Sequence, residues 1–152
     1  MTKEGTQSGN RIKVPSYNVN TNDSSLIGNL KWIKIYVQKN QKYEKALLDN
    51  CAGISLIDKN YAEGLQLTKI NVEPIVLEGA GNHIIHNFGR VKFNIYIEDK
   101  LYTIYPIIIK HFNPKILLGS EFLVQNNVEI SYLANSLSLS DPSNPLNRID
   151  HY

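Results

Sequence analysis

Asp49 is the residue of this chain whose surroundings most clearly point to chemistry. It follows the apolar residues 46–48 and comes directly before Asn50, Cys51 and Ala52, after which an apolar run resumes. A carboxylate at the end of a buried strand is costly unless it is paired, hydrogen-bonded or protonated. The simpler interpretation is a turn aspartate that caps a loop between two strands. Both interpretations place Asp49 in a tight loop, as either a structural or a catalytic carboxylate.

Cys51 is a second candidate, because a thiol can act as a nucleophile. It would need a nearby base, and an anionic Asp49 close by would disfavour the thiolate that attacks a substrate. We therefore expect Cys51 to be a small, buried packing residue.

His83 and His86 are the residues that most resemble metal ligands. Their odd separation places them on opposite faces of a strand, and no Cys or carboxylate completes a ligand set. The nearby run Gly79-Ala80-Gly81 does not match a phosphate-binding loop, since neither a Lys-Ser/Thr pair nor a helix follows it. The sequence thus predicts no metal and no cofactor.

The overall composition excludes several classes of protein. The 152 residues carry a formal net charge of +2, and no basic run concentrates that charge, so we expect no nucleic-acid binding by this domain and no membrane anchor. The single cysteine excludes an internal disulfide framework and suits a reducing compartment. No apolar stretch approaches the roughly 20 residues that span a bilayer. We expect an intracellular protein, most simply a cytoplasmic one.

The ends of the chain differ in composition from its middle. Residues 1–29 are rich in Thr, Ser, Asn and Gly, and residues 141–152 are similarly polar, so both are predicted to be flexible, as a leader and a tail. The folded domain is predicted to occupy residues 30–140.

The elements that must position Asp49 are predicted to be strands. Ile33, Ile35 and Val37 alternate with polar residues, and the same period recurs from Val91 to Ile97. Asp58 is expected to cap one helical turn that ends at Gly64. Further strands are predicted at residues 43–48, 54–57, 72–77, 101–109, 115–118, 128–132 and 137–139. One short helix near the C-terminus follows Gly119, with Ser120 as its N-cap, so the fold class is all-β.

Trp32 and the nine tyrosines can be interpreted in two ways. Aromatic rings stack on nucleic-acid bases when a basic face accompanies them. Because the sequence displays no basic face, we expect these rings to be core and strand residues.

The order of these parts resembles the retropepsins, the dimeric aspartic proteases of retroviruses and LTR retrotransposons. The resemblance extends over residues 30–139: an apolar strand, Asp49 in a tight loop, a second apolar strand, a glycine-tipped hairpin and the run Ile116-Leu117-Leu118-Gly119-Ser120-Glu121-Phe122-Leu123. The spacing of Glu121-Phe122-Leu123 to the alternating apolar residues at 128–132 and 137–139 is most similar to gypsy-class retrotransposon proteases.

This resemblance implies a specific architecture and reaction. The fold would be a single-lobed, closed β-barrel of the acid protease type, and two copies would form a homodimer in which Asp49 of each subunit meets at the two-fold axis. Gly79, Ala80, Gly81 and Asn82 would form the tip of a flap that closes over an extended polypeptide substrate. The chain would then be an aspartic endopeptidase domain of LTR-retroelement origin.

The chain departs from the family in the catalytic loop. Retropepsins have Asp-Thr-Gly or Asp-Ser-Gly followed by Ala, whereas this chain has Asp49-Asn50-Cys51-Ala52. Asn50 is longer than the hydroxyl residue that grips the partner loop, and Cys51 adds a side chain where the family has none. The alternative is therefore a catalytically silent retropepsin fold that serves as a dimerisation or peptide-binding module. A third interpretation is a domain of another intracellular protein with a proteolytic or ubiquitin-linked role.

Overall fold

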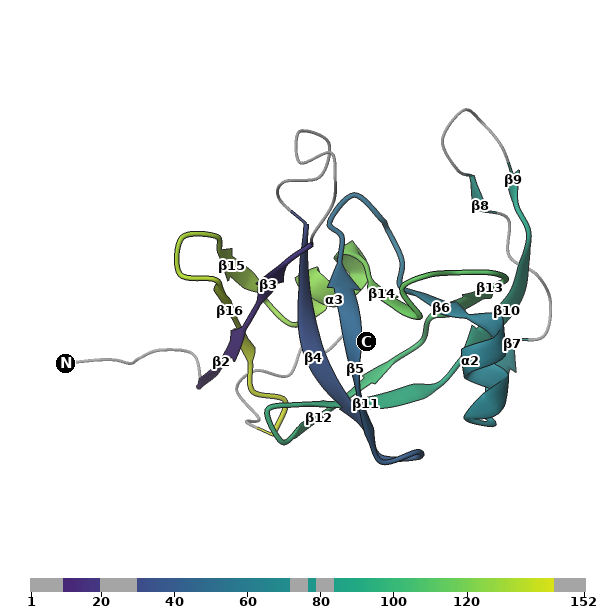
Figure 1. Ribbon diagram of the computed structural model, residues 1–152, viewed down its shortest axis with the longest axis horizontal. Helices are drawn as coiled ribbons and strands as arrows, with labels where there is room; N and C mark the ends of the chain where they lie inside the picture. The colour runs from purple at the N-terminus through teal and green to yellow at the C-terminus, as the bar shows by residue number, and fades with distance from the viewer. Residues whose placement is uncertain (1–9, 20–29, 72–76, 79–83, 144–152) are drawn as a thin grey trace, which may run out of the picture.

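The computed structural model describes residues 10–19, 30–71, 77–78 and 84–143, and Figure 1 shows their arrangement. Strands dominate, as the alternating patterns predicted, so the all-β prediction is confirmed. The predicted flap tip (Gly79, Ala80, Gly81 and Asn82), most of the strand predicted at 72–77 and residues 144–152 of the predicted tail lie outside the described residues.

The main sheet contains ten strands and curves strongly (Figure 1). Nine of them lie in the order β12-β11-β4-β5-β14-β6-β13-β10-β7, and β3 pairs with β4 beside this path. Because the order ends at β12 and β7, closure into a complete barrel stays a prediction. The strands are β3 (Tyr17–Asn18), β4 (Lys31–Val37), β5 (Lys42–Leu48), β6 (Leu56–Asp58), β7 (Lys69–Asn71), β10 (Asn87–Val91), β11 (Phe93–Ile97), β12 (Lys100–Ile104), β13 (Ile107–Ile109) and β14 (Ile116–Leu118).

Two smaller sheets and two helices complete the described residues. The first sheet has the order β15-β16-β2, and the second is the pair β8-β9. Neither helix is long and apolar enough to cross a membrane. These elements are β2 (Arg11–Pro15), β8 (Leu77–Glu78), β9 (Ile84–Ile85), β15 (Glu129–Ser131), β16 (Ser136–Ser140), α2 (Lys59–Gly64) and α3 (Ser120–Gln125).

The hairpin β4–β5 forms as its alternation predicted. Ile33, Ile35 and Val37 are almost completely buried on one face of β4. The polar turn closes with a hydrogen bond from the Gln41 amide to the Gln38 carbonyl, with Gln41 at positive φ. Burying each such aliphatic side chain stabilises the fold by about 1.5–3 kcal/mol, which fixes the register that carries Asp49 at the end of β5.

Two predicted long strands are each broken into two. The run from Val91 to Ile97 is interrupted at Lys92, whose amide donates to the Thr68 carbonyl instead of to the sheet. The run at 101–109 is interrupted at Tyr105 and Pro106, since proline cannot donate a ladder hydrogen bond. These breaks let β11 and β12 pair with each other while β10 and β13 turn toward β6 and β7.

One of the two predicted helix N-caps is confirmed and the other is wrong. Asp58 caps α2 as predicted, with one carboxylate oxygen 3.1 Å from the Tyr61 amide and the other 2.8 Å from the Phe112 amide. The prediction that Ser120 caps α3 is wrong, because Gly119 occupies the N-cap position and Ser120 is the first helical residue.

Part of the predicted leader is folded. β2 pairs along its whole length with β16, so that Val14 lies opposite Leu137 and is buried. The expectation of a flexible leader is therefore wrong for residues 11–18, which form β2 and β3. Only Ile12 and Val14 in β2 are apolar enough to indicate a strand, and its partner β16 is distant in sequence.

Candidate active site

Asp49 lies where the chain leaves β5 and turns toward β6. Strand β14 is inserted between these two strands, running parallel to β5 and antiparallel to β6. The loop of residues 49–55 must therefore pass around the end of β14, in a ψ-shaped arrangement (Figure 1). The sequence prediction of a tight loop between two strands is confirmed. The structure shows in addition that a third strand, β14, lies between those two strands.

Hydrogen bonds fix both the backbone and the carboxylate of Asp49. Its amide donates to the Leu118 carbonyl at 3.1 Å, and its carbonyl accepts from the Ala52 amide at 3.2 Å. One carboxylate oxygen accepts from the Cys51 amide at 2.9 Å. The side chain is only half-buried. The loop thus holds a half-buried carboxylate in a defined orientation.

Gly119 and Ser55 lock the far side of the loop onto β14. The Gly119 amide donates to the buried Ser55 hydroxyl at 3.2 Å. A Cβ at position 119 would lie 2.4 Å from the Ile54 carbonyl oxygen and 2.7 Å from that of Ala52. Real Cβ atoms essentially never approach backbone so closely, so only glycine allows the loop to pack against this strand end.

The start of α3 is bound to the same loop. The Ser120 amide donates to the Ala52 carbonyl at 2.7 Å, and the Glu121 amide donates to the Gly53 carbonyl at 3.0 Å. The Ser120 hydroxyl also donates to Gly53, at 3.3 Å. These contacts satisfy amides that a helix start leaves without internal partners. The loop, β14 and α3 therefore form one hydrogen-bonded unit.

Glu121 connects this unit to β10 of the main sheet. Its carboxylate lies 3.7 Å from the Arg90 guanidinium, which also donates to the Tyr105 carbonyl at 2.8 Å. Both side chains are partly exposed, so the ion pair is worth at most about 1 kcal/mol. The pair is a weak link between β10, which carries Arg90, and the first turn of α3, which carries Glu121.

Asn50 and Cys51 form the exposed tip of the loop, whereas Ala52 is half-buried. The Cys51 sulfur lies 3.7 Å from the Asn50 side-chain oxygen and is a free thiol. The prediction that Cys51 is a buried packing residue is wrong, because the loop turns its side chain outward while its amide turns toward Asp49.

The predicted flap tip is flanked by a short hairpin. β8 and β9 pair antiparallel, with Leu77 opposite Ile85 and Glu78 opposite Ile84. Because Gly79, Ala80, Gly81 and Asn82 lie outside the described residues, their assignment as a flap stays a prediction. Of the two histidines weighed as ligands, His83 is also outside, and His86 packs edge-on against Phe88. No group of three potential metal ligands occurs within the described part of the chain.

Sequence reasoning missed Ser55 as a residue that positions the loop. Its signal was a lone hydroxyl residue inside the apolar run from Ile54 to Ile57. A polar side chain in such a run is buried only when it has a partner, and here the partner is the Gly119 amide.

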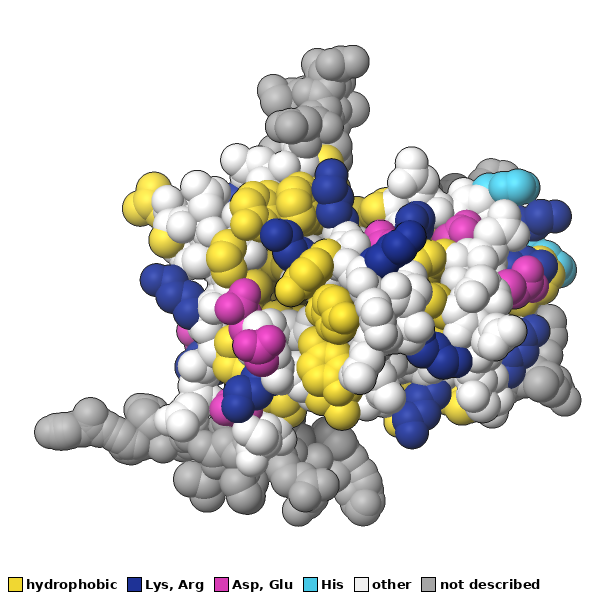
Figure 2. Space-filling view, turned by 60° about the horizontal axis from the view of Figure 1, so that its bottom comes forward, with side chains coloured by type: hydrophobic (Ala, Val, Ile, Leu, Met, Phe, Trp, Pro, Cys, Tyr) yellow, Lys and Arg dark blue, Asp and Glu magenta, His cyan; other side chains and the backbone are white. Residues whose placement is uncertain are grey.

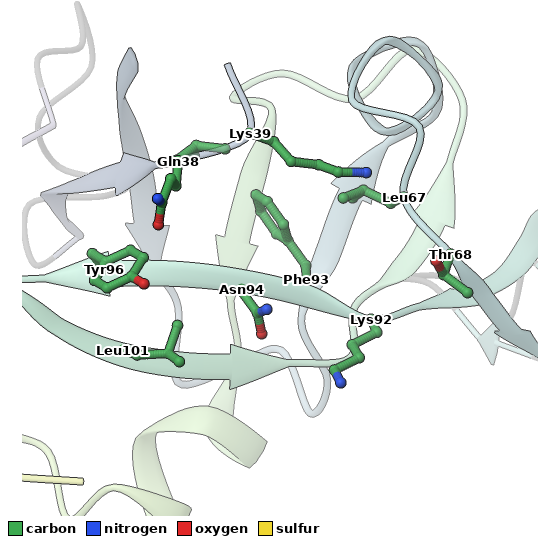
Figure 3. A pocket seen from close by; sticks show the side chains of 10 residues that line it. Gln38, Lys39, Leu67, Thr68, Lys92, Phe93, Asn94, Tyr96 and Leu101 are labelled. Carbon is green, nitrogen blue, oxygen red and sulfur yellow. The ribbon is translucent and has the colours of Figure 1, made fainter. Parts of the chain in front are cut away.

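A hollow of about 390 Å³ lies in another part of the domain, beside the β4–β5 turn and β11 (Figure 3). Phe93 lies at its base and Lys39 at its edge, where the ammonium group donates to the Gln66 carbonyl at 2.8 Å. Its lining includes no residue of the loop at 49–55, so it does not belong to the candidate active site.

Comparison with known proteins gives a clear result for structure and none for sequence. No family model and no curated protein matches the chain. Among solved structures, the retroviral protease-like domain of Ddi1 from Leishmania major is similar with a TM-score of 0.57 and 18% identity, covering 74% of this chain and 89% of that one. The chain has a retropepsin-like fold.

Two further retropepsin-like structures are similar in fold to this chain. EIAV protease in complex with the inhibitor HBY-793 is similar with a TM-score of 0.53 and 15% identity, over 76% of this chain and 97% of that one. A retropepsin-like aspartic protease from Rickettsia conorii gives a TM-score of 0.52 and 15% identity, over 86% and 90%. At such low identities the retropepsin-like similarity concerns the fold, and the chemistry must be argued from the residues of this chain.

Proposed function

We propose that this chain is an aspartic endopeptidase domain of LTR-retroelement origin that hydrolyses peptide bonds as a homodimer, with Asp49 as its catalytic residue. The observation that carries the proposal is the position of the Asp49 carboxylate. It lies half-exposed on the loop that passes around β14, in a fold shared with retropepsin-like proteases.

The reaction requires two carboxyl groups close together. One carboxylate takes a proton from a water molecule, which attacks the peptide carbonyl carbon, while the other carboxyl group donates a proton to the carbonyl oxygen. Two carboxyl groups held this close share one proton and titrate as a pair. The sequence holds one such aspartate loop, so a symmetric dimer is the arrangement that would supply the second Asp49.

The altered loop is compatible with this chemistry because of which atoms hold Asp49. The group that hydrogen-bonds its carboxylate is the backbone amide of Cys51, and every residue except proline supplies that amide. The outward direction of the Cys51 side chain leaves this contact intact. Asn50, also exposed, retains a donor and an acceptor for contacts with a partner loop.

The three-stranded sheet β15-β16-β2 offers an edge for dimer formation. β15 pairs with β16 along one side, and no strand of residues 10–19, 30–71, 77–78 or 84–143 pairs with its other side. An unpaired strand edge is a template for adding a strand from another chain. An extended polypeptide substrate would be bound by the same backbone pairing, between the loop and the predicted flap. The free thiol of Cys51 suits a reducing compartment, inside the cell.

The test is cleavage of a peptide library by the purified chain at acidic and neutral pH. Asp49→Asn should lower the cleavage rate by about a hundredfold or more, because it removes the proton-transferring group. Asp99→Asn is the matched control, since Asp99 is an exposed turn residue at positive φ, a conformation that asparagine also tolerates. Cleavage that survives Asp49→Asn would exclude the aspartic mechanism.

A catalytically silent module is the second candidate, and the exposed loop tip favours it. Asn50 and Cys51 both depart from the retropepsin pattern at the positions next to the catalytic aspartate. Absence of cleavage by a chain that still forms dimers in light scattering would support the silent module. A stable monomer at high concentration would contradict both candidates.

A further inference from the structure

One face of the main sheet carries aromatic rings and lysines that are exposed or half-buried. We call it the aromatic–lysine face; it consists of Tyr17, Trp32, Lys34, Tyr36, Tyr43 and Lys45. On β4 these residues alternate with the buried Ile33 and Ile35, so they point away from the core. Tyr17 is 40% and Tyr43 is 66% exposed, so both rings are strand residues as expected, but the expectation of core residues is wrong for these two. Figure 2 shows apolar side chains gathered in a band across one side of the molecule, with basic side chains among them and acidic side chains along one edge.

The rings form two groups separated along the strands. Tyr17 stacks on Trp32 with ring centres 4.3 Å apart and an interplanar angle of 23°. Tyr36 and Tyr43 face each other across β4 and β5, with centres 5.0 Å apart. Trp32 and Tyr36 are four residues apart on one strand, so the groups lie roughly 13 Å from each other.

The two lysines lie between these groups. Lys34 and Lys45 are directly opposite each other on β4 and β5. The Lys45 ammonium lies 4.8 Å from the centre of the Trp32 ring, and that of Lys34 lies 5.5 Å from the Tyr43 ring. Neither lysine forms an ion pair with any described residue. Like charges placed directly opposite destabilise a sheet, and an anion bound between them removes that cost.

No carboxylate on these strands neutralises the face. The residues of β4 and β5 that point outward are aromatic, aliphatic or lysine, and the one acidic residue, Glu44, belongs to the opposite face and pairs with Lys115 at 3.5 Å. The face therefore favours an anionic ligand that also presents flat apolar surfaces.

Hollows lie at both ends of the face. Tyr17, Trp32 and Lys45 line one of about 720 Å³, together with Asn18 and Asn113. This size lies within the range of small-molecule sites. At the other end, Tyr96 pairs with Tyr36 across β11 and β4 and lines the 390 Å³ hollow of Figure 3.

We propose that the aromatic–lysine face binds single-stranded nucleic acid. Bases would stack on the two ring groups, phosphates would lie beside Lys34 and Lys45, and one base would enter the 720 Å³ hollow, whose lining includes Asn18 and Asn113. An acidic peptide would use the lysines but leave the rings and the hollow without matching groups. The sequence expectation of no nucleic acid rested on the lack of a basic run, whereas these lysines meet only when β4 and β5 pair. This inference does not depend on the proposed proteolysis.

The test is fluorescence anisotropy with labelled oligo(U) and oligo(dT) of about twelve nucleotides, a length that suits one such site. Tyr43→Ala should weaken binding about fivefold or more, because a stacking position is lost. Lys34→Gln with Lys45→Gln should reduce the slope of log affinity against log salt by about 1.4, twice the 0.7 expected for each phosphate contact with a single strand. Comparison of the two oligonucleotides tells whether RNA or DNA is preferred.

The matched control is Lys69→Gln with Lys110→Gln, which removes the same charge from exposed lysines outside the face. It should leave the salt slope nearly unchanged. Equal losses in both double variants, equal binding of poly-glutamate, or unaltered binding by Tyr43→Ala would each overturn the proposal. Conversion of a dimer into a monomer by Tyr43→Ala would also overturn it, because the face would then be an interface between two copies.

Discussion

The loop of residues 49–55 has two parts that are held very differently. The loop base, residues 52–55, is fastened to β14 and α3 through the Ala52 and Gly53 carbonyls and the Ser55 hydroxyl. The loop tip, Asn50 and Cys51, is exposed, and the Cys51 side chain contacts only its neighbour among the hydrogen bonds of the described residues.

This contrast separates what the fold requires from what the chemistry requires. Gly119, on which the loop base packs, matches the retropepsin pattern, and the Ala52 and Ile54 carbonyls of the loop base leave no space for a side chain there. The loop tip departs from the pattern, and the fold tolerates the departure because neither side chain enters the core. Conversely, under the proposed function the tip is where a partner loop and a substrate would approach, so we expect its residues to affect activity more than stability.

Gly119→Ala should give the largest loss of stability, because the added methyl group would overlap the backbone of the loop base. The added Cβ would clash with the Ile54 and Ala52 carbonyls, and the Ala52 carbonyl cannot move without breaking its hydrogen bond from the Ser120 amide of α3. We expect the free energy of unfolding in urea to fall by about 3 kcal/mol, the upper end of the usual cost of overpacking. Gly53→Ala is the matched control in the same loop, since a Cβ there meets open space, and a similar loss in that variant would contradict the distinction.

Ser55→Ala should give the next largest effect. The buried Gly119 amide would lose its acceptor, which costs about 1–3 kcal/mol in the free energy of unfolding. Ser131→Ala removes the same kind of contact, a hydroxyl that accepts from the Ala134 amide, but at an exposed site. Water replaces the exposed contact, so its loss should be about 0.5 kcal/mol or less. Equal losses in the two variants would show that the loop base has no special importance.

Asn50→Thr combined with Cys51→Gly tests the loop tip. The double change restores the retropepsin pattern, so cleavage should rise about tenfold, equivalent to about 1.4 kcal/mol of transition-state stabilisation. The free energy of unfolding should change by less than this, because both side chains are exposed. Adding Asp49→Asn to the double variant should abolish the gain. Unchanged cleavage in the double variant would mean that the tip does not limit activity.

Asp141→Asn should have the smallest effect on the free energy of unfolding. It serves as a reference because Asp141 lies outside the loop of residues 49–55. The Ser143 hydroxyl and amide donate to the Asp141 carboxylate and, with Lys100, lower its pKa below the usual value. A lowered folded-state pKa stabilises the protein above the unfolded-state pKa, and this contribution disappears as the pH falls through the folded-state value. The difference between wild type and variant in urea unfolding should therefore be present at neutral pH and shrink below about pH 4. A difference independent of pH would contradict this origin.

The sequence was a good guide wherever one face of a strand is buried and the other is not. The alternation of Ile33, Ile35 and Val37 predicted β4, and Asp58 predicted the start of α2. It was a poor guide to where long strands break, since the pattern continues unchanged across Lys92 while the hydrogen bonds do not. β2 was missed because it is held by β16, a partner that local patterns do not reveal.

The position of the candidate site was predictable from the sequence, but the contacts that hold its loop in place were not. Asp49 stood out because a carboxylate follows an apolar strand. The hydrogen bond between Ser55 and Gly119 joins residues that are distant in sequence. It forms only because β14 is inserted between β5 and β6, and local sequence patterns do not reveal that insertion. The exposure of Cys51 depends on the path of the loop around β14, which composition does not determine.

Cys51 also gives the native chain a unique attachment point. It is the single cysteine of the sequence, and it is exposed two residues beyond Asp49. A maleimide dye or nitroxide label would therefore attach once per chain, at the loop tip, without any substitution. In a two-fold dimer the two labels would define one distance, and pulsed electron paramagnetic resonance would measure how the two loops approach each other as peptide is added.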